Sequence, residues 1–220
     1  MTTAGGAQVL SVHLIRHGET QASREHRFCG LRDCELSDLG RQQVEALTRH
    51  WSDNGDLRAV HTSPLSRCRL LAEAIAAHRA VPVHVDEGLR EIDHGSWDGR
   101  REDEVRATEP EAYQAYGDHP GMIAPHGGET GYQVAARALP VLTRITETYD
   151  DGDVLVVSHK AVIRIVACAL LGIDIDLYRA RLAQPVASVT SFDIRPGGPL
   201  LRRLGDLSDL PDELRTGGGV

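Results

Sequence analysis

Two histidines, two arginines and one glutamate stand shortly after strand-like segments of this 220-residue chain. Arg16 and His17 follow an apolar run at residues 9–15, Arg67 follows a run at 57–62, Glu91 follows a run at 82–85, and His159 follows a run at 153–157. In an open α/β sheet, ligands bind outside the carboxyl ends of the strands. We therefore expect these five side chains to converge on one small site.

These residue types form a complete set for phosphoryl transfer. The planar fork of arginine matches phosphate oxygens, and the free N–H groups at helix N-termini also favour anions. A neutral histidine can attack phosphorus in line, and a carboxyl group can protonate the leaving oxygen. Arg67 and His159 are each expected at the start of a helix. The sequence therefore predicts a phosphoryl-transfer site that needs neither a metal ion nor a cofactor.

Other interpretations of single residues stay open or are excluded by geometry. Glu91 could instead be a structural ion-pair partner of an arginine. His94 and His126 are further candidates for lining the pocket. His13 and His17 are four residues apart, but on a strand this spacing separates them by ~13 Å, which is too far for one metal ion. The sequence contains no Walker loop and no Gly-x-Ser-x-Gly motif, which excludes two common hydrolase types.

The elements that must position these residues alternate between strand-like and helical patterns. Strands are predicted at 9–15, 57–62, 82–85 and 153–157, with a terminal strand pair at 188–194 and 200–204. Helices are predicted at 37–51, after a cap at Ser63, and at 161–171. This alternation predicts an α/β fold, a three-layer α/β/α sandwich with a mainly parallel central sheet.

The stretch from 95 to 130 is polar and rich in glycine and proline, with short helical pieces at 102–107 and 111–116. We expect it to form a small inserted cap region over one edge of the sheet. The predicted organisation is a flexible N-terminus at 1–8, one catalytic domain at 9–207 and a C-terminal tail at 208–220.

Composition limits the partners. The net charge is −8 and the pI is about 5.7, which argues against nucleic acid or an anionic membrane as the main partner. A locally basic pocket for a small anion remains compatible with this charge. No signal peptide and no membrane-spanning stretch is visible, so a cytoplasmic location is expected. The sequence leaves a homodimer open.

The four cysteines show no pairing pattern. Cys29, Cys34, Cys68 and Cys168 form neither a Cys-x-x-Cys pair nor a zinc-binding spacing. In a cytoplasmic protein this pattern indicates reduced thiols. Cys34 and Arg41 are also one residue too far apart for a cysteine-phosphatase loop.

Five segments of the chain resemble one known family. Residues 14–20 (LIRHGET) are similar to the signature of the histidine phosphatase superfamily, the phosphoglycerate-mutase-like proteins. The other segments resemble the family in the same order: 63–67 (SPLSR), 89–99 (LREIDHGSWDG), 127–130 (GGET) and 156–159 (VVSH). The similarity extends over residues 9–207, nearly the whole chain.

The resemblance implies a role for each residue of the set. His17 would carry the phosphoryl group, and Glu91 would donate a proton to the leaving group. Arg16, Arg67 and His159 would hold the phosphoryl oxygens. The expected activity is a metal-independent phosphatase acting on a small phosphorylated metabolite.

The resemblance also implies substrate contacts at four further positions: Ser23, Cys29, Gly30 and the backbone N–H of Lys160. Two of these depart from the family pattern. Ser23 stands where asparagine is usual, and its hydroxyl is shorter and has a single donor. Lys160 stands where glycine is frequent, so it adds a cation near the site.

Residues 92–95 (IDHG) replace a run that is characteristic of glycolytic mutases, so the chain resembles the phosphatase branch. The alternatives are a phosphoglycerate-type mutase and a non-catalytic phospho-ligand-binding protein, because one fold can host both.

Overall fold

The computed structural model describes residues 9–215. Within this range one mixed sheet has the strand order β3-β2-β4-β1-β5-β6. The strands are β1 Leu10–Arg16, β2 Leu57–Thr62, β3 Val83–Val85, β4 Gly152–Ser158, β5 Val189–Arg195 and β6 Gly198–Asp206. The first four strands of this order pair in parallel, whereas β5 and β6 are antiparallel. The prediction of a mainly parallel sheet is confirmed.

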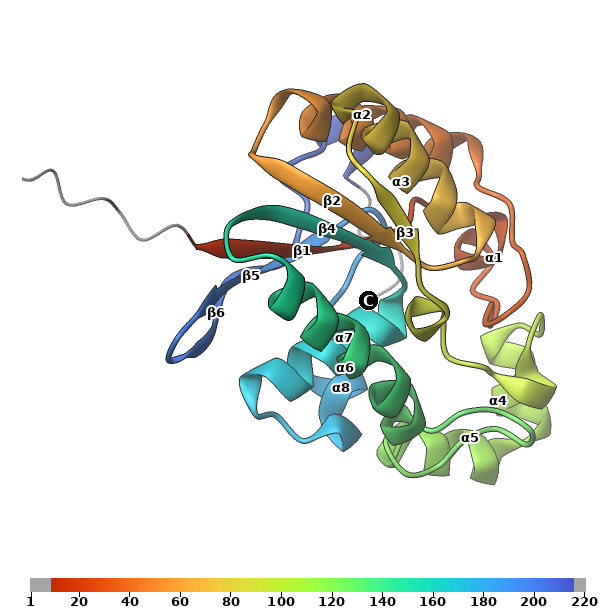
Figure 1. Cartoon of the computed structure of the whole chain (residues 1–220). Helices are drawn as coiled ribbons and strands as arrows, with labels where there is room; N and C mark the ends of the chain where they lie inside the picture. The colour runs from red at the N-terminus through yellow and green to blue at the C-terminus, as the bar shows by residue number, and fades with distance from the viewer. Residues whose placement is uncertain (1–8, 216–220) are drawn as a thin grey trace, which may run out of the picture.

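Helices cover both faces of the sheet (Figure 1). They are α1 Gln21–Arg24, α2 Asp38–Asp53, α3 Ser66–Arg79, α4 Glu102–Thr108, α5 Pro110–Asp118, α6 Gly131–Thr148, α7 Lys160–Leu171 and α8 Tyr178–Arg181. In Figure 1, α2 and α3 lie above the sheet, and α6, α7 and α8 lie below it. This arrangement confirms the predicted three-layer α/β/α sandwich.

Strand β4 shows why the sheet is buried on both sides. Successive side chains of a strand point to opposite faces. Val154 and Val156 accordingly join the core cluster that contains α6 and α7, while Leu155 and Val157 join the cluster that contains α2 and α3. A continuous apolar run is therefore required at β4, as is typical of a strand in a parallel sheet with helices on both faces.

Two helix assignments differ from the sequence analysis. It missed α6, whose N-terminus carries a capping box between Thr130 and Gln133. Ser63 was expected to cap the helix that follows β2, but α3 begins at Ser66. The hydroxyl of Ser63 instead lies 2.7 Å from the ring of His159.

Helices α4 and α5 lie in the stretch from 95 to 130, beyond the β-sheet in Figure 1. This stretch also contains a short 3₁₀ helix, Gly95–Trp97. Trp97, Val105 and Tyr116 form a small buried cluster of their own. The segment therefore has a local core in addition to its contacts with the rest of the domain.

Part of the predicted C-terminal tail is packed rather than loose. Leu210 is 2% exposed and belongs to the core cluster on the α2 and α3 side of the sheet. The side-chain amide of Gln43 in α2 donates to the carbonyl of Leu214. The rest of the predicted tail, 216–220, and the predicted flexible N-terminus, 1–8, lie outside the described residues.

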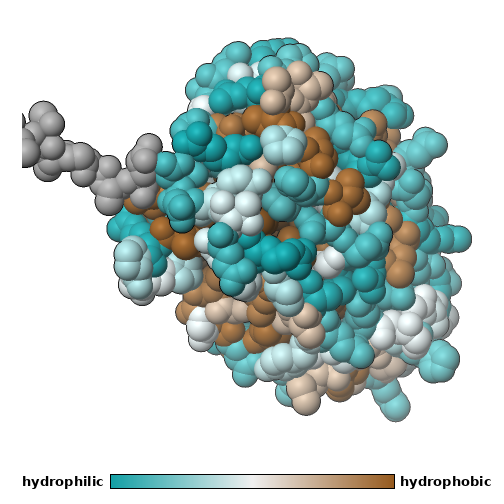
Figure 2. Space-filling view, in the orientation of Figure 1, coloured by the Kyte–Doolittle hydropathy of each residue, from teal (hydrophilic) through white to brown (hydrophobic). Residues whose placement is uncertain are grey.

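The face of the molecule seen in Figure 1 has a mainly hydrophilic surface, interrupted by separate hydrophobic areas (Figure 2). No helix within residues 9–215 combines the length and the apolar character needed to cross a lipid bilayer.

Candidate active site

The central strand pair brings two histidines together. In the parallel pair of β1 and β4, Arg16 is opposite Ser158. The next residues, His17 and His159, therefore leave the sheet at the same level, and their ring centroids are 5.2 Å apart. Strand β2 lies beside β4 and leads to Arg67, and β3 lies beside β2 and leads to Glu91.

A pocket of about 360 Å³ opens at this edge of the sheet. The predicted site residues that line it are Arg16, His17, Ser23, Cys29, Arg67, Glu91 and Lys160. Two other predicted site residues, Gly30 and His159, are not part of the pocket lining. The structure therefore brings together the predicted nucleophile, both predicted phosphate-binding arginines and the predicted proton donor.

The orientation of His17 leaves one ring nitrogen available for attack. Its Nδ1 lies 2.7 Å from the carbonyl oxygen of Gly18, which can only accept a hydrogen bond. Nδ1 therefore carries the proton, and the lone pair is on Nε2. Burial lowers the pKa of His17 well below its usual value, and Arg67 and Arg16 lower it further. His17 is thus neutral at pH 7, as a nucleophile must be.

His159 is fully buried and holds Arg67. The Nε–H of Arg67 donates to Nδ1 of His159 over 3.3 Å, so Nε2 of His159 carries the proton and donates to Ser63 Oγ. Burial, followed by the charge of Arg67, lowers the pKa of His159 well below its usual value. In this geometry His159 contacts the pocket through Arg67 rather than directly.

Both arginines predicted to bind phosphate are anchored by backbone carbonyls. Arg16 donates from Nη1 to the carbonyl of Gln184 at 2.6 Å, and its buried Nε has no partner within residues 9–215. Burial lowers the pKa of Arg16 to about 10, so the side chain remains a cation at neutral pH. Arg67 donates to the carbonyls of Gly30 and Arg32, each over 2.8 Å. These bonds fix the two guanidinium planes and leave other N–H groups for a ligand.

Glu91 lies on the pocket wall, and its loop is rigidly held. Its Oε1 accepts a hydrogen bond from the backbone N–H of Ile92. Arg137 donates to three carbonyls of this loop region, those of Gly88, Arg90 and Glu91, and also pairs with Glu129. Within the described part of the chain, the Glu91 carboxylate itself forms no ion pair, so its alternative role as an arginine partner is not supported.

Three of the four other predicted contacts have structural functions. The Ser23 hydroxyl accepts from the backbone N–H of Thr20 and donates to the Thr20 carbonyl, which closes the capping box of α1. A Cβ atom at Gly30 would lie 2.6 Å from the carbonyl oxygen of Ile92, so no larger residue fits there. Cys29 is half-buried in the pocket wall and is not a free thiol.

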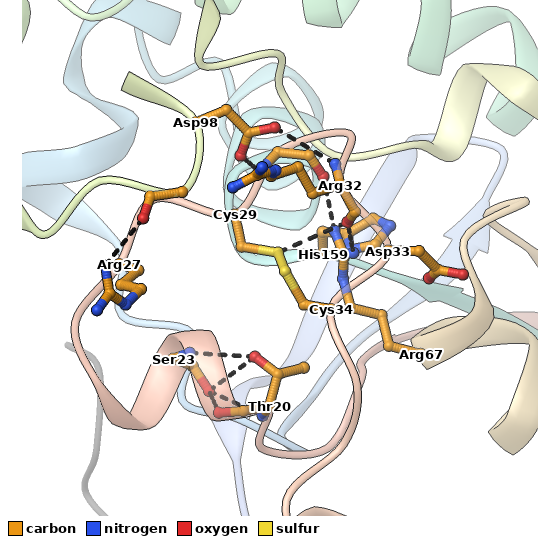
Figure 3. The surroundings of a disulfide bond; sticks show 12 residues. Thr20, Ser23, Arg27, Cys29, Arg32, Asp33, Cys34, Arg67, Asp98 and His159 are labelled. Carbon is orange, nitrogen blue, oxygen red and sulfur yellow. Dashed lines mark hydrogen bonds between the residues drawn. A yellow bond between two sulfur atoms is a disulfide. The ribbon is translucent and has the colours of Figure 1, made fainter. Parts of the chain in front are cut away.

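The expectation of four reduced thiols is wrong for one pair, since Cys29 and Cys34 form a disulfide (Figure 3). Cys68 and Cys168 are free and buried. The pairing depends on a loop that folds back on itself against Asp98, which accepts from the N–H of Gly30. No local sequence pattern encodes this contact across 68 residues.

The disulfide loop supports the site in two ways. Its carbonyls at Gly30 and Arg32 hold the guanidinium of Arg67. Its carboxylate at Asp33 accepts from both the backbone N–H and the hydroxyl of Ser66, the first residue of α3. Because α3 has no side-chain cap of its own at Leu65, the loop supplies the missing acceptor.

Several pocket residues were missed by the sequence analysis. His94, which it named as a candidate, does line the pocket, but His126 does not. Arg164 and Arg179 also line it and were not identified. The spacing of Arg164, one helical turn after Lys160, could have indicated it, because residues i and i+4 share a helix face. Arg179 lies in the short helix α8 and gave no comparable signal.

The pocket is strongly basic although the protein is acidic. Its lining contains six cationic residues, Arg16, Arg27, Arg67, Lys160, Arg164 and Arg179, and two carboxylates, Glu91 and Glu102. Burial and the charges of Arg16, Arg164 and Arg179 lower the pKa of Lys160 to about 7. Within residues 9–215 no cluster of three His, Cys, Asp or Glu side chains could hold a metal ion. The charge of the pocket suits a small, multiply charged anion.

A sequence profile of the histidine phosphatase superfamily (branch 1) matches residues 12–207. The chain belongs to this superfamily. Phosphoserine phosphatase 1 of Hydrogenobacter thermophilus is 33% identical over 165 residues, which cover 75% of this chain and 78% of the relative. A glucosyl-3-phosphoglycerate phosphatase of Mycolicibacterium vanbaalenii is 36% identical over 170 residues, which cover 74% and 75%.

Two solved structures match this chain over most of its length. Bacillus stearothermophilus YhfR matches with a TM-score of 0.84 and 31% identity over 91% of this chain and 98% of its own. A mycobacterial glucosyl-3-phosphoglycerate phosphatase in complex with VO3 matches with a TM-score of 0.79 and 28% identity over 89% and 98%. The family and these relatives identify this histidine phosphatase as a phosphomonoesterase, a hydrolase.

The disulfide should contribute to stability and to substrate affinity. Replacing Cys29 and Cys34 together by serine should lower the free energy of unfolding by about 2 kcal/mol, because the unfolded chain regains the freedom of a closed loop. It should also raise KM, because the carbonyls that hold Arg67 become mobile. Urea denaturation and steady-state kinetics measure both effects. Reducing the wild-type protein should reproduce them, and the double serine variant should be insensitive to the reductant. A wild-type protein that is equally insensitive would contradict this role.

His17 should stay neutral through the mildly acidic range. Burial and the two neighbouring arginines lower its pKa, so its ring should not take up a proton as the pH falls from 8 to 5.5. His119 provides an internal control, since its hydrogen bond to Asp176 raises its pKa and it should titrate above pH 6.5. Side-chain NMR of both rings tests the difference. Protonation of His17 near pH 6.5 would contradict a lowered pKa for this residue.

Proposed function

We propose that this histidine phosphatase hydrolyses a small phosphomonoester, without a metal ion, through a phosphohistidine on His17. The observation that carries this proposal is the free Nε2 of neutral His17 in a pocket also lined by Arg16, Arg67 and Glu91. These groups match the requirements of the reaction: a nucleophile, cations for the transferring oxygens and a proton donor. The phosphatase relatives support the same assignment.

In the first step, Nε2 of His17 attacks phosphorus, and the P–N bond forms as the P–O bond to the leaving group breaks. The Nδ1–H bond to Gly18 keeps the ring in the reactive tautomer and stabilises the positive charge that develops on it. Arg16 and Arg67 stabilise the charge on the three equatorial oxygens. Protonated Glu91 gives its proton to the leaving oxygen, which departs as an alcohol.

In the second step, water attacks phosphorus and the P–N bond breaks, which restores His17 and gives inorganic phosphate. Glu91, now ionised, accepts a proton from the attacking water, because the group that acts as an acid in one direction acts as a base in the other. His159 is a positioning residue in this scheme. It fixes the orientation of Arg67 through Nδ1 and is itself fixed by Ser63.

The covalent intermediate is the most direct test. With ³²P-labelled phosphomonoester and rapid quenching without acid, peptide mapping should place the label on His17, and mild acid should remove it because a P–N bond is acid-labile. His17→Ala should abolish turnover and leave the fold intact. His119→Ala is the matched control, since His119 is exposed and is not part of the pocket lining, and it should retain both label and turnover. An active His17→Ala protein would overturn the proposal.

The role of Glu91 predicts a dependence on the leaving group. Glu91→Gln removes the acidic proton and keeps the size of the side chain, so alkyl phosphates should be hydrolysed ~10²-fold more slowly. p-Nitrophenyl phosphate should be affected much less, because its leaving group needs little protonation. The test compares kcat/KM for the two substrates. If Glu91 were only structural, the substitution would lower kcat/KM equally for both.

Metal independence follows from the cationic lining of the pocket. Arg16 and Arg67 supply the positive charge that a metal ion provides in other phosphatases. Activity should therefore survive prolonged incubation with excess EDTA, measured as phosphate release. A complete loss that Mg²⁺ or Mn²⁺ restores would contradict the proposed mechanism.

A further inference from the structure

Arg164 is a buried cation that has no partner among residues 9–215. Its side chain is 7% exposed and lines the same pocket as His17. It forms no hydrogen bond and no ion pair with any residue between 9 and 215, and its Nε is both buried and unsatisfied. A buried charge without a counter-ion is strongly unfavourable. The free protein therefore maintains a guanidinium whose counter-ion it does not itself supply.

Two further cations lie around Arg164. Lys160 is one helical turn earlier on α7, and Arg179 is on α8, with its guanidinium 4.6 Å from the centre of the Tyr116 ring. Both line the pocket, and within the described range neither forms an ion pair. Burial, and after it the neighbouring arginines, lower the pKa of Lys160 to about 7 and lower that of Arg164, whereas the tyrosines beside Arg179 and Glu102 raise the pKa of Arg179.

The nearby carboxylates act on these cations only at longer range, where Glu91 favours the charged form of Arg164 and Glu102 favours those of Lys160 and Arg179. Glu102 lines the pocket, but it accepts a hydrogen bond from the hydroxyl of Tyr113 and forms no ion pair with these three cations. Glu91 accepts from the backbone of Ile92 and is the proposed proton donor. The group also differs from Arg16 and Arg67, which are both anchored by backbone carbonyls.

We propose that Lys160, Arg164 and Arg179 form a second anion subsite, so the substrate carries another anionic group, a carboxylate or a second phosphate, in addition to its phosphomonoester. This proposal rests on the function proposed above. The subsite shares one pocket of about 360 Å³ with His17, so both anionic groups belong to one small molecule. An arginine fork with a lysine beside it suits either kind of anionic oxygen.

Matched substrates test the subsite on the wild-type enzyme. The first pair is 3-phosphoglycerate and glycerol 3-phosphate, which differ by a carboxylate. The second pair is 1,3-propanediol bisphosphate and propyl phosphate, which differ by a phosphate. The wild type should prefer the doubly anionic member of at least one pair by ~10-fold or more in kcat/KM, as expected for a charge-assisted hydrogen bond. The preferred pair identifies which anionic group the subsite accepts.

Arg164→Met assigns this preference to the subsite. The preference should fall by ~10-fold, through a higher KM for the doubly anionic substrate. The melting temperature of the ligand-free variant should be unchanged or higher, since the substitution removes an unpaired buried charge. Lys160→Met changes a second, half-buried position and should reduce the preference in the same direction. Arg181→Met is the matched control: it removes the same charge from an exposed site on α8 and should leave the preference unchanged.

Two results would overturn the subsite. One is a wild type that hydrolyses both members of each pair equally well. The other is an Arg164→Met enzyme that loses activity equally on the singly and doubly anionic substrates. Failure of the proposed function is distinguishable, because it would give no phosphate release from any ester, including p-nitrophenyl phosphate, or release that survives His17→Ala.

Discussion

The parallel pairing of β1 with β4 is the constraint on which the site depends. Its register places Arg16 opposite Ser158, and the bond from the His17 N–H to the Ser158 carbonyl continues the pairing one residue beyond the strand. His17 and His159 therefore lie side by side beyond the two strand ends, and His159 directly precedes α7. A shift of one residue in a strand would turn every side chain to the opposite face. Such a shift in β4 would exchange Val154 and Val156 with Leu155 and Val157 between two close-packed cores, which opposes it.

Much of this arrangement could be predicted from the sequence, because the rule for parallel sheets is general. Strand β2 was predicted with the bounds observed, β3 differs by one residue at its start, and β1 and β4 differ by one residue at each end. Once four strand ends are located, the convergence of His17, Arg67 and Glu91 follows from topology alone. The short helices α4 and α5 were also predicted, because their helical patterns are local and α5 begins with Pro110 at its first position.

The remaining features depend on contacts between distant segments. The disulfide forms because loop 29–34 is folded against residue Asp98, and no pattern within the loop encodes that contact. His159 was expected to touch the substrate, but its orientation is decided by Ser63 and Arg67, which come from the neighbouring strand end. Helix α6 was missed although its Thr130 capping box is a local signal, and the interior Pro140 disguises it.

The two kinds of arginine in the pocket indicate how an acidic protein maintains a strongly basic site. Arg16 and Arg67 have lost most of their water, but carbonyl dipoles of the backbone replace part of that hydration and also fix their orientation. Such anchoring suits groups that must meet a transition state in one geometry. Arg164 lacks this compensation. Its charge raises the free energy of the empty pocket. An anion that binds there removes this unfavourable term and also forms a new contact. The selectivity for a doubly anionic substrate therefore exceeds what the contact alone would provide.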